Sequence, residues 1–470
     1  MGRVMLLPTT QRALLHRAAV AQADNRVPSL VCAVVRDGES VWTHAIEGSP
    51  DDQYRIGSLT KTFIAVLVMR LRDEGRLDLS DPVADHLDGV PAGPLTIRQL
   101  LAHTGGLPAE APGPWWERTS GDLRPTLADV LGEHPRRHPA GQRFHYSNPG
   151  YALLGALVER KRGRPWDEVA ADEIFGPLGM SRTSATPRAP YAKGWAVHPW
   201  ADVLLPEEVH HTGLLAPAGQ LWSTVGDLAR FATFLAGGTE TEGADGVLSS
   251  STLAEMRQPH SAPSAAVWDG SYGLGMQVLR SGERLLVGHT GSMPGYLCAL
   301  WISVDERIGG VALTNATSGL PIGQFVADLV GILGDHEPAM PKPWRPLSEV
   351  DNDVLALTGV WYWGPAGYAL RLHADARLEL TSVRGGRVAG FRRTGPRTWI
   401  GCDGYWDGET LRTVHVGDRL DHLDVGGFVM TREPYDADAE IPGGVDPGGW
   451  RAVPPAASRA PGISGQISED

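Results

Sequence analysis

Residues 58–69 read Ser-Leu-Thr-Lys-Thr-Phe-Ile-Ala-Val-Leu-Val-Met, and this segment says most about the fold of the 470-residue chain. It predicts a helix over residues 58–74. The run at 63–69 is apolar on every side, and such a helix belongs inside a domain rather than on its surface. The polar side chains at its start, Ser58 and Lys61, are therefore expected at the edge of a buried core.

The residues around this helix predict a mixed α/β domain with an antiparallel sheet. Asp37-Gly38 joins two strand-like runs, which is a typical hairpin signal. Ser223 or Thr224 is expected to cap a later helix, with Asp227 placed to complete a capping box. Strands are expected at 30–35, 40–45, 285–288, 297–302 and 310–314, and further helices at 9–24, 150–161, 228–235 and 322–333. Strands from both ends of this region are expected to share one sheet.

The chain is expected to have four segments. Residues 1–336 form the first domain, 337–350 a linker, 351–435 a small antiparallel β-barrel and 436–470 a disordered tail. The linker holds four prolines, too many for a helix or a central strand. Short β-rich runs that are separated by turn residues indicate the barrel. The tail is rich in Pro, Gly, Ser and Ala and has too few apolar residues to form a core.

Composition argues against several classes of function. A net charge of -13 without a Lys/Arg cluster disfavours binding to nucleic acid or to an anionic membrane. Cys32, Cys298 and Cys402 form no disulfide framework and no Cys-x-x-Cys pair. His210-His211 has no third ligand at useful spacing, so neither a metal nor another cofactor is expected. Without a signal peptide or a membrane-spanning run, we expect a soluble, cytoplasmic protein.

Ser58 and Lys61 form the first candidate chemical motif. Side chains three apart on a helix share a face, with Cβ atoms about 5–6 Å apart. A serine hydroxyl becomes a good nucleophile when a base removes its proton, and a desolvated lysine can be that base. The pair also fits a helix-capping serine beside a surface lysine, but its place on a buried helix favours the chemical interpretation.

Two further segments carry candidate site residues. In Tyr146-Ser147-Asn148, the tyrosine could relay a proton and the asparagine amide could hold a substrate amide. An ordinary turn before a helix is the alternative. His289-Thr290-Gly291-Ser292 follows a strand-like run, and its glycine would let a substrate backbone approach closely. A histidine that simply ends a strand is the alternative there.

In this order, Ser-x-x-Lys, Tyr-x-Asn and His-Thr-Gly resemble the serine β-lactamase and penicillin-binding-protein superfamily. The likeness is to its class C β-lactamase and D-alanyl-D-alanine carboxypeptidase branch and covers about residues 10–335. Supporting segments lie at 100–108, 177–180 and 216–224. The resemblance implies an acyl-enzyme on Ser58, acid–base catalysis by Lys61 and Tyr146, and an acyl-donor amide held by Asn148. It also implies an oxyanion hole from the N–H groups of Ser58 and Ser292, with Thr290 and Gly291 beside the substrate.

His289 departs from the commonest pattern of this superfamily, in which a lysine holds a substrate carboxylate. Histidine is largely neutral at pH 7, although its place in the motif keeps it among the candidate catalytic residues. The exchange weakens the case for a β-lactamase or a carboxypeptidase. It fits the superfamily's esterases and its stand-alone thioesterases, which release and macrocyclise nonribosomal peptides.

The chain most resembles those thioesterases, in segments 113–118, 194–200 and 289–295 and in an appended lipocalin-like domain. This resemblance implies a peptidyl thioester or ester substrate, which a carrier protein can hold, with a D-configured C-terminal residue. A cytosolic esterase, D-aminopeptidase or carboxypeptidase-like hydrolase could use the same residues. A sensor that is acylated once, or an inactive scaffold, is the non-enzymatic alternative. Ring size and oligomeric state stay open. Five tryptophans are expected either to border the site or to pack the helical region: Trp115, Trp116, Trp195, Trp200 and Trp222.

Overall fold

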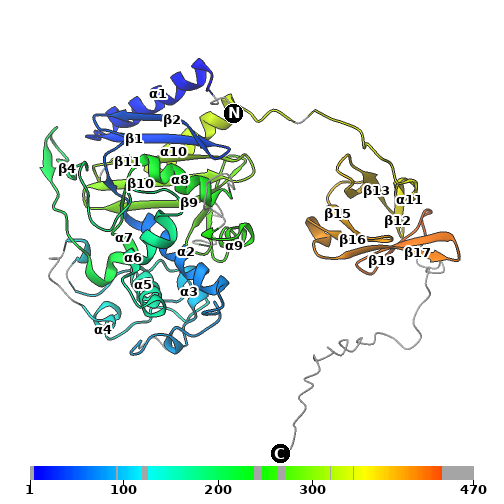
Figure 1. The fold of residues 1–470 in the computed structure, drawn as a ribbon, viewed down its shortest axis with the longest axis horizontal. Helices are drawn as coiled ribbons and strands as arrows, with labels where there is room; N and C mark the ends of the chain where they lie inside the picture. Colours follow the sequence, from blue (N-terminus) through cyan, green and yellow to red (C-terminus); the bar gives the residue numbers. More distant parts are fainter. Residues whose placement is uncertain are drawn as a thin grey trace, which may run out of the picture. The chain divides into compact units, whose positions relative to one another are not determined.

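The computed structural model describes residues 5–90, 94–113, 115–118, 125–237, 246–262, 270–317, 319–341 and 343–436. The chain divides into two compact units, Met1–Met340 and Pro341–Asp470 (Figure 1). The tail expected at 436–470 lies outside the described residues, except for Asp436. No helix in the described ranges is both long enough and apolar enough to cross a lipid bilayer.

A seven-stranded antiparallel sheet forms the centre of the first unit. Its strand order is β2-β1-β11-β10-β9-β8-β7. The strands are β1 (Leu30–Arg36), β2 (Glu39–Ile46), β7 (Gly270–Tyr272), β8 (Gln277–Ser281), β9 (Arg284–Met293), β10 (Tyr296–Ser303) and β11 (Ile308–Thr314). Leu30 of β1 pairs with Thr314 of β11, which confirms that distant strands share one sheet.

Helices cover both faces of this sheet. Strand β1 alternates between two apolar cores: Val31 and Ala33 face one, and Cys32 and Val34 face the other. This burial on both sides explains why β1 is a continuous apolar run. One core includes residues of α1 (Pro8–Asp24) and α10 (Ile322–His336). The other includes residues of α2 (Thr60–Asp73), α5 (Asn148–Arg162) and α8 (Val225–Leu235).

Helix α2 is buried as predicted, but it begins two residues later than expected. A 3-10 turn, η1 (Gly57–Leu59), precedes it, so Ser58 lies in this turn. Gly57 has a φ of +53°, a conformation that glycine adopts readily. Residues 60–69 are all buried, and Phe63 stacks on Phe231 of α8 with ring centroids 3.9 Å apart. The core therefore fixes the helix that carries Lys61.

Short elements complete the first unit. The remaining helices are α3 (Ile97–Leu101), α4 (Leu127–Leu131), α6 (Trp166–Ala170), α7 (Ala216–Gly219) and α9 (Ser250–Met256). Two small ribbons pair β3 (Tyr54–Arg55) with β6 (Trp222–Ser223) and β4 (Trp195–Val197) with β5 (Leu204–Pro206). Thr224 caps α8 by accepting a hydrogen bond from the Asp227 N–H at 3.2 Å. The expected capping box is wrong, because the Asp227 carboxylate instead accepts from the Arg182 N–H (2.8 Å) and the Thr183 hydroxyl (2.9 Å).

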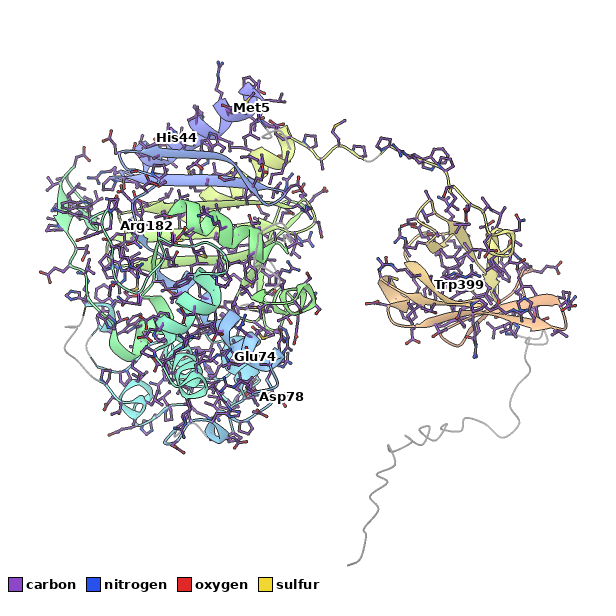
Figure 2. All side chains as sticks on the ribbon, viewed as in Figure 1. Met5, His44, Glu74, Asp78, Arg182 and Trp399 are labelled. Carbon is purple, nitrogen blue, oxygen red and sulfur yellow. The ribbon has the colours of Figure 1, made fainter. Side chains whose placement is uncertain are left out.

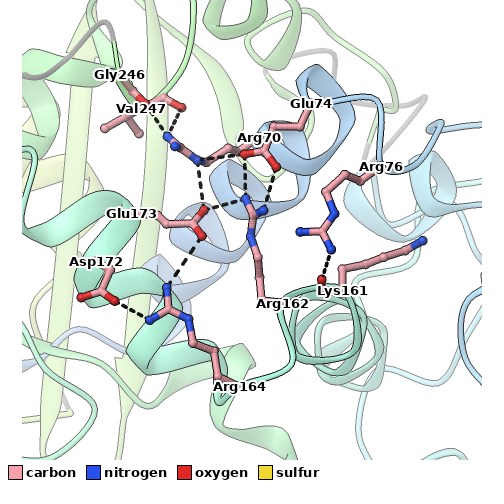
Figure 3. Close-up of polar contacts among 10 residues, drawn as sticks. All are labelled: Arg70, Glu74, Arg76, Lys161, Arg162, Arg164, Asp172, Glu173, Gly246 and Val247. Carbon is pink, nitrogen blue, oxygen red and sulfur yellow. Dashed lines mark hydrogen bonds and ion pairs between the residues drawn. The ribbon is translucent and has the colours of Figure 1, made fainter.

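An ion-pair network ties the helical region together (Figure 3). Arg162 of α5 donates to Glu74, just after α2, at 2.7 Å and to Glu173 at 2.8 Å. Arg70 of α2 approaches the same Glu173 carboxylate at 3.0 Å. Glu173 lies in η4 (Ala171–Phe175), a turn of π-helix that continues α6. The network therefore holds α2, α5 and η4 together.

The second unit is a small antiparallel β-barrel, which confirms the predicted fold class. After α11 (Asn352–Leu357), each strand pairs with the next. The strands are β12 (Gly359–Trp363), β13 (Ala366–Leu372), β14 (Leu378–Ser382), β15 (Val388–Gly395), β16 (Thr398–Gly401), β17 (Thr410–Val416), β18 (Arg419–Val425) and β19 (Phe428–Met430). A bridge between Tyr362 and Thr431 brings the two ends together. Trp361, Trp399 and Trp406 are buried in its core, and Trp399 is labelled in Figure 2.

Candidate active site

Lys61 is positioned to act on Ser58. Its Nζ donates to Ser58 Oγ at 3.0 Å and to the Ala218 carbonyl at 2.7 Å. Burial lowers the pKa of Lys61 to about 7, while the charges of Glu110 and Glu117 oppose this shift. A lysine with that pKa is partly neutral near pH 7, and its neutral amine can accept a proton. The pair has the geometry of a nucleophile and its base.

Tyr146 completes a group of three around the serine hydroxyl. Lys61 Nζ lies 4.9 Å from the centroid of the Tyr146 ring. Burial raises the pKa of Tyr146 above its usual range, and a hydrogen bond with Ser58 works against that shift. Tyr146 is therefore a neutral phenol, which can donate and accept protons without becoming a lasting anion. The structure thus brings Ser58, Lys61 and Tyr146 together.

His103 supports the loop that carries Tyr146. Its Nδ1 accepts a hydrogen bond from the Ser147 N–H at 3.1 Å, and its ring centroid lies 4.2 Å from that of Tyr146. Burial lowers the pKa of His103 well below its usual value. A neutral ring whose acceptor nitrogen is engaged by Ser147 orients the loop.

The third motif lies inside β9 rather than after a strand. A Cβ atom on Gly291 would lie 1.9 Å from the Ile56 carbonyl oxygen and 3.1 Å from the Ser58 nitrogen. A Cβ on Gly57 would lie 2.5 Å from the Ser292 nitrogen. Two glycines thus let β9 approach η1 closely enough to bring the backbones of Ser58 and Ser292 together. Thr290, on the same strand, donates its backbone N–H to Gln277 Oε1 at 3.3 Å.

His289 is neutral and engaged at both ring nitrogens. Its Nδ1–H donates to the Thr290 carbonyl at 2.5 Å, and its Nε2 accepts from the Tyr272 hydroxyl at 3.0 Å. Burial, followed by the charge of Lys61, lowers the pKa of His289 to about 3. Its ring centroid is 6.4 Å from that of Tyr146. The side chain therefore supplies no cation for a substrate carboxylate.

Asn148 is held by a residue that the sequence did not single out. Its Nδ2 donates to both carboxylate oxygens of Glu110 at 2.9 Å, and Trp116 Nε1 donates to the same carboxylate at 2.6 Å. Asn148 is 6% exposed, and its Oδ1 has no hydrogen-bond partner among the described residues. Glu110 follows the motif segment that ends at Pro108, but no spacing rule connects it with a residue 38 positions away.

Some of the five tryptophans lie beside the candidate site, and others pack elsewhere in the first unit or are exposed. Trp116 contacts Glu110 through its indole, and Trp115 donates to Glu117 at 2.9 Å. Trp222 instead packs in the core beside Tyr296, with centroids 5.1 Å apart. Trp195 belongs to the β4–β5 ribbon, and Trp200 is 90% exposed. The pair at 115–116 is therefore the part of this set that borders the candidate site.

Comparisons with known proteins match both units. A family model described as Beta-lactamase matches residues 16–334, well over half of the chain. A model described as a domain of unknown function, DUF7586, matches residues 350–432. The first match covers Ser58, Lys61, Tyr146 and the motif in β9.

Curated relatives and solved structures agree with the first match. Penicillin-binding protein 4 of Amycolatopsis lactamdurans is 28% identical over 377 residues, 74% of this chain and 96% of that protein. Beta-lactamase-like protein 2 of Dictyostelium discoideum is 28% identical over 254 residues, 48% of this chain and 46% of that protein. The chain thus spans about half the length of the second relative. A D-stereospecific amidohydrolase from Streptomyces sp. superposes with a TM-score of 0.59 at 27% identity, over 68% of this chain and 98% of that one.

Proposed function

This chain belongs to the beta-lactamase family of serine-dependent enzymes, and from that premise we propose that it transfers acyl groups through an acyl-enzyme on Ser58. The observation that carries the proposal is the 3.0 Å contact between Lys61 Nζ and Ser58 Oγ. Burial lowers the pKa of that lysine to about 7, so its neutral form is available as a base.

The proposed reaction has two steps, acylation of Ser58 and transfer of the acyl group to an acceptor. Ser58 Oγ bonds to the carbonyl carbon of the acyl donor while its proton passes to Lys61. The N–H groups of Ser58 and Ser292 stabilise the negative carbonyl oxygen, and the leaving group takes a proton through Tyr146 as its bond breaks. An acceptor then attacks the ester and gives its proton to the same pair, and Ser58 recovers its hydrogen.

Labelling with a fluorophosphonate tests the nucleophile directly. We expect one adduct, on Ser58, and neither adduct nor turnover in Ser58→Ala. Ser40→Ala, which removes an exposed hydroxyl on β2, is the matched control and should be labelled like the wild type. An adduct on a different serine in the wild type would refute the assignment.

We propose that the acyl donor carries a D-configured residue at the attacked carbonyl and needs no carboxylate beside it. The likeness to a D-stereospecific amidohydrolase supports the first point. The neutral, fully engaged His289 supports the second. With water as acceptor, the enzyme is an amide, ester or thioester hydrolase.

A second candidate uses the amine of a peptide as acceptor and releases a ring. Segments 113–118, 194–200 and 289–295 support it, because they resemble thioesterases that cyclise nonribosomal peptides. The donor would then be a peptidyl thioester, which a carrier protein can present. Of these segments, the first places Trp115 and Trp116 beside the two carboxylates Glu110 and Glu117.

A linear peptidyl thioester separates the two candidates. Its products differ by the mass of one water: a free acid from hydrolysis and a ring from cyclisation. We expect turnover with a D-residue at the C-terminus and little with its L-epimer. If every peptide tried yields the free acid, the cyclase function is excluded and the hydrolase function is supported.

A further inference from the structure

Glu110 presents a carboxylate at the candidate site without a cationic partner. It is exposed, yet hydrogen bonds from Asn148 and Trp116 fix its orientation. No ion pair in the described part of the chain involves Glu110. The guanidinium of Arg118, which is close in sequence, pairs with Glu207 at 2.5 Å instead. An oriented but unneutralised carboxylate is suited to binding a cation from solution.

The electric field at Ser58 also favours a positive ligand. The charges of Glu110 and Glu117 both raise the pKa of Lys61 and that of Tyr146, so both carboxylates lie within Coulomb range of the reacting groups. The nearby cations leave the charge of Glu110 without a direct partner among the described residues. Arg55 is buried, donates to Gln220 Oε1 at 3.0 Å and interacts through its charge with Glu117, and His289 is neutral.

Asn148 adds an acceptor that the protein does not satisfy. Because its amide hydrogens face the Glu110 carboxylate, its Oδ1 is an acceptor, and reversing the amide would set two oxygens against each other. This Oδ1 belongs to a side chain that is 6% exposed and has no partner among the described residues. Buried acceptors are normally paired, so this position has room for a hydrogen-bond donor from a ligand.

We propose that Glu110 and Asn148 bind a primary ammonium group of the substrate beside the carbonyl that Ser58 attacks. An ammonium group supplies a positive charge for the carboxylate and N–H donors for both side chains. The inference rests on the proposed function, because it places the ammonium group relative to Ser58. Two sources share this chemistry: the α-ammonium group of the residue being acylated, and the N-terminus of a peptide acceptor.

A pair of boronic acids tests the first source without requiring turnover. Boron accepts an electron pair from Ser58 Oγ and so competes with fluorophosphonate labelling. We expect D-configured 1-aminoethylboronic acid to compete more strongly than its N-acetyl derivative, on the order of ten-fold, the usual effect of a charge-assisted hydrogen bond. This wild-type comparison needs no variant, and equal or reversed potency would overturn the first source.

Variants then assign the preference to Glu110. In Glu110→Gln, the ratio of the two potencies should fall to about one, whereas Glu133→Gln, an exposed surface control, should keep the wild-type ratio. A purely positioning role through Asn148 would weaken both inhibitors and leave the ratio unchanged, which would overturn the proposal. Glu110→Asp keeps the charge and should retain part of the preference, so it remains informative if the glutamine variant folds poorly.

Aminolysis tests the second source. The enzyme is acylated with an N-acetyl-D-alanyl thioester, and D-alaninamide is offered as acceptor. If the acceptor's ammonium group binds here and gives one proton to the Glu110 carboxylate before its nitrogen attacks the ester, Glu110→Gln should lower the ratio of amide to acid product by about ten-fold. If Glu110→Gln changes neither the ratio of inhibitor potencies nor the ratio of products, the inference is overturned. Failure of the serine proposal would look different, because Ser58 of the wild type would then take no fluorophosphonate.

Discussion

Lys61 shows how burial converts an ordinary cation into a base. Its side chain is fully buried, and it meets Ser58 Oγ and one carbonyl rather than a carboxylate. Desolvation penalises the charged form, while Glu110 and Glu117 act from farther away and only partly restore it. The two carboxylates therefore limit how far the pKa of Lys61 falls.

The pH dependence of acylation should report this lysine. Because the pKa of Lys61 is lowered from 10.5 to about 7, its neutral form dominates above pH 7, and kcat/KM should rise with pH through a midpoint near that value. Lys61→Arg should abolish acylation, since a guanidinium keeps its proton. Measured rates of fluorophosphonate labelling between about pH 5.5 and 8.5 provide the check. A flat profile would exclude Lys61 as the base.

Gly291 should be irreplaceable for a steric reason. The Cβ of an alanine would lie 1.9 Å from the Ile56 carbonyl oxygen, so β9 and η1 must separate. We expect Gly291→Ala to destabilise the fold by about 1–3 kcal/mol, as overpacking does, and to abolish labelling of Ser58. Gly226→Ala is the control, because nothing lies within 4 Å of its added Cβ in α8. Thermal unfolding of the two variants measures the difference, and equal melting temperatures would contradict the close approach.

At this scale the sequence predicted which residue types meet and that Lys61 and His289 can be neutral, but not the contacts that set their pKa values. The three-residue spacing was enough to predict that Lys61 lies beside Ser58, although Ser58 belongs to the 3-10 turn before α2. The Asn148–Glu110 contact joins the first residue of α5 to a loop residue 38 positions away, and no local pattern encodes it. The neutrality of His289 likewise depends on the Tyr272 hydroxyl and on burial, which are properties of the folded chain.

Elements with long apolar runs were predicted best. The continuous apolar run in β1 and the apolar residues on all sides of α2 predicted that both elements are buried on every side. The structure confirms this burial. Element ends depended on finer details. The start of α2 gives way to a 3-10 turn because Gly57 adopts a positive φ, and the Asp227 carboxylate turns to a neighbouring loop instead of its own helix cap. Such alternatives differ by one or two hydrogen bonds, which sequence patterns do not resolve.

The ion-pair network between α2, α5 and η4 should contribute to stability. Glu173 and Arg162 are 15% and 11% exposed, so removing one charge leaves the others poorly solvated. We expect Glu173→Gln to lower the free energy of unfolding by about 1–3 kcal/mol, less than for a fully buried pair. Asp172→Asn is the control: its carboxylate is 67% exposed and pairs with Arg164, so its loss should be close to neutral. Denaturant unfolding compares them, and equal losses would refute a cooperative network.

For the whole molecule, the composition of the chain and the positions of its prolines and turn residues predicted the domains. They did not indicate the substrate. The change from helical patterns to short strands after the prolines predicted a β-barrel, and the structure has one. In the proposed reaction, the choice of acyl donor depends on charges that folding brings near Lys61, such as those of Glu110 and Glu117. The family match likewise identifies serine chemistry while leaving the acceptor, water or an amine, to experiment.

The two units should fold independently, because each has its own apolar core. The two cores of the first unit draw on residues between Leu6 and Leu333, and the barrel core draws on residues from Val354 to Met430. We therefore expect a chain that ends at Met340 to unfold cooperatively and to take fluorophosphonate on Ser58 at nearly the wild-type rate. Calorimetry of the full chain should show a second transition that the shorter chain lacks. If the shorter chain folds and is labelled but yields more free acid from a peptidyl thioester, the barrel influences the choice of acceptor. Loss of folding or labelling would show instead that the first unit depends on the second.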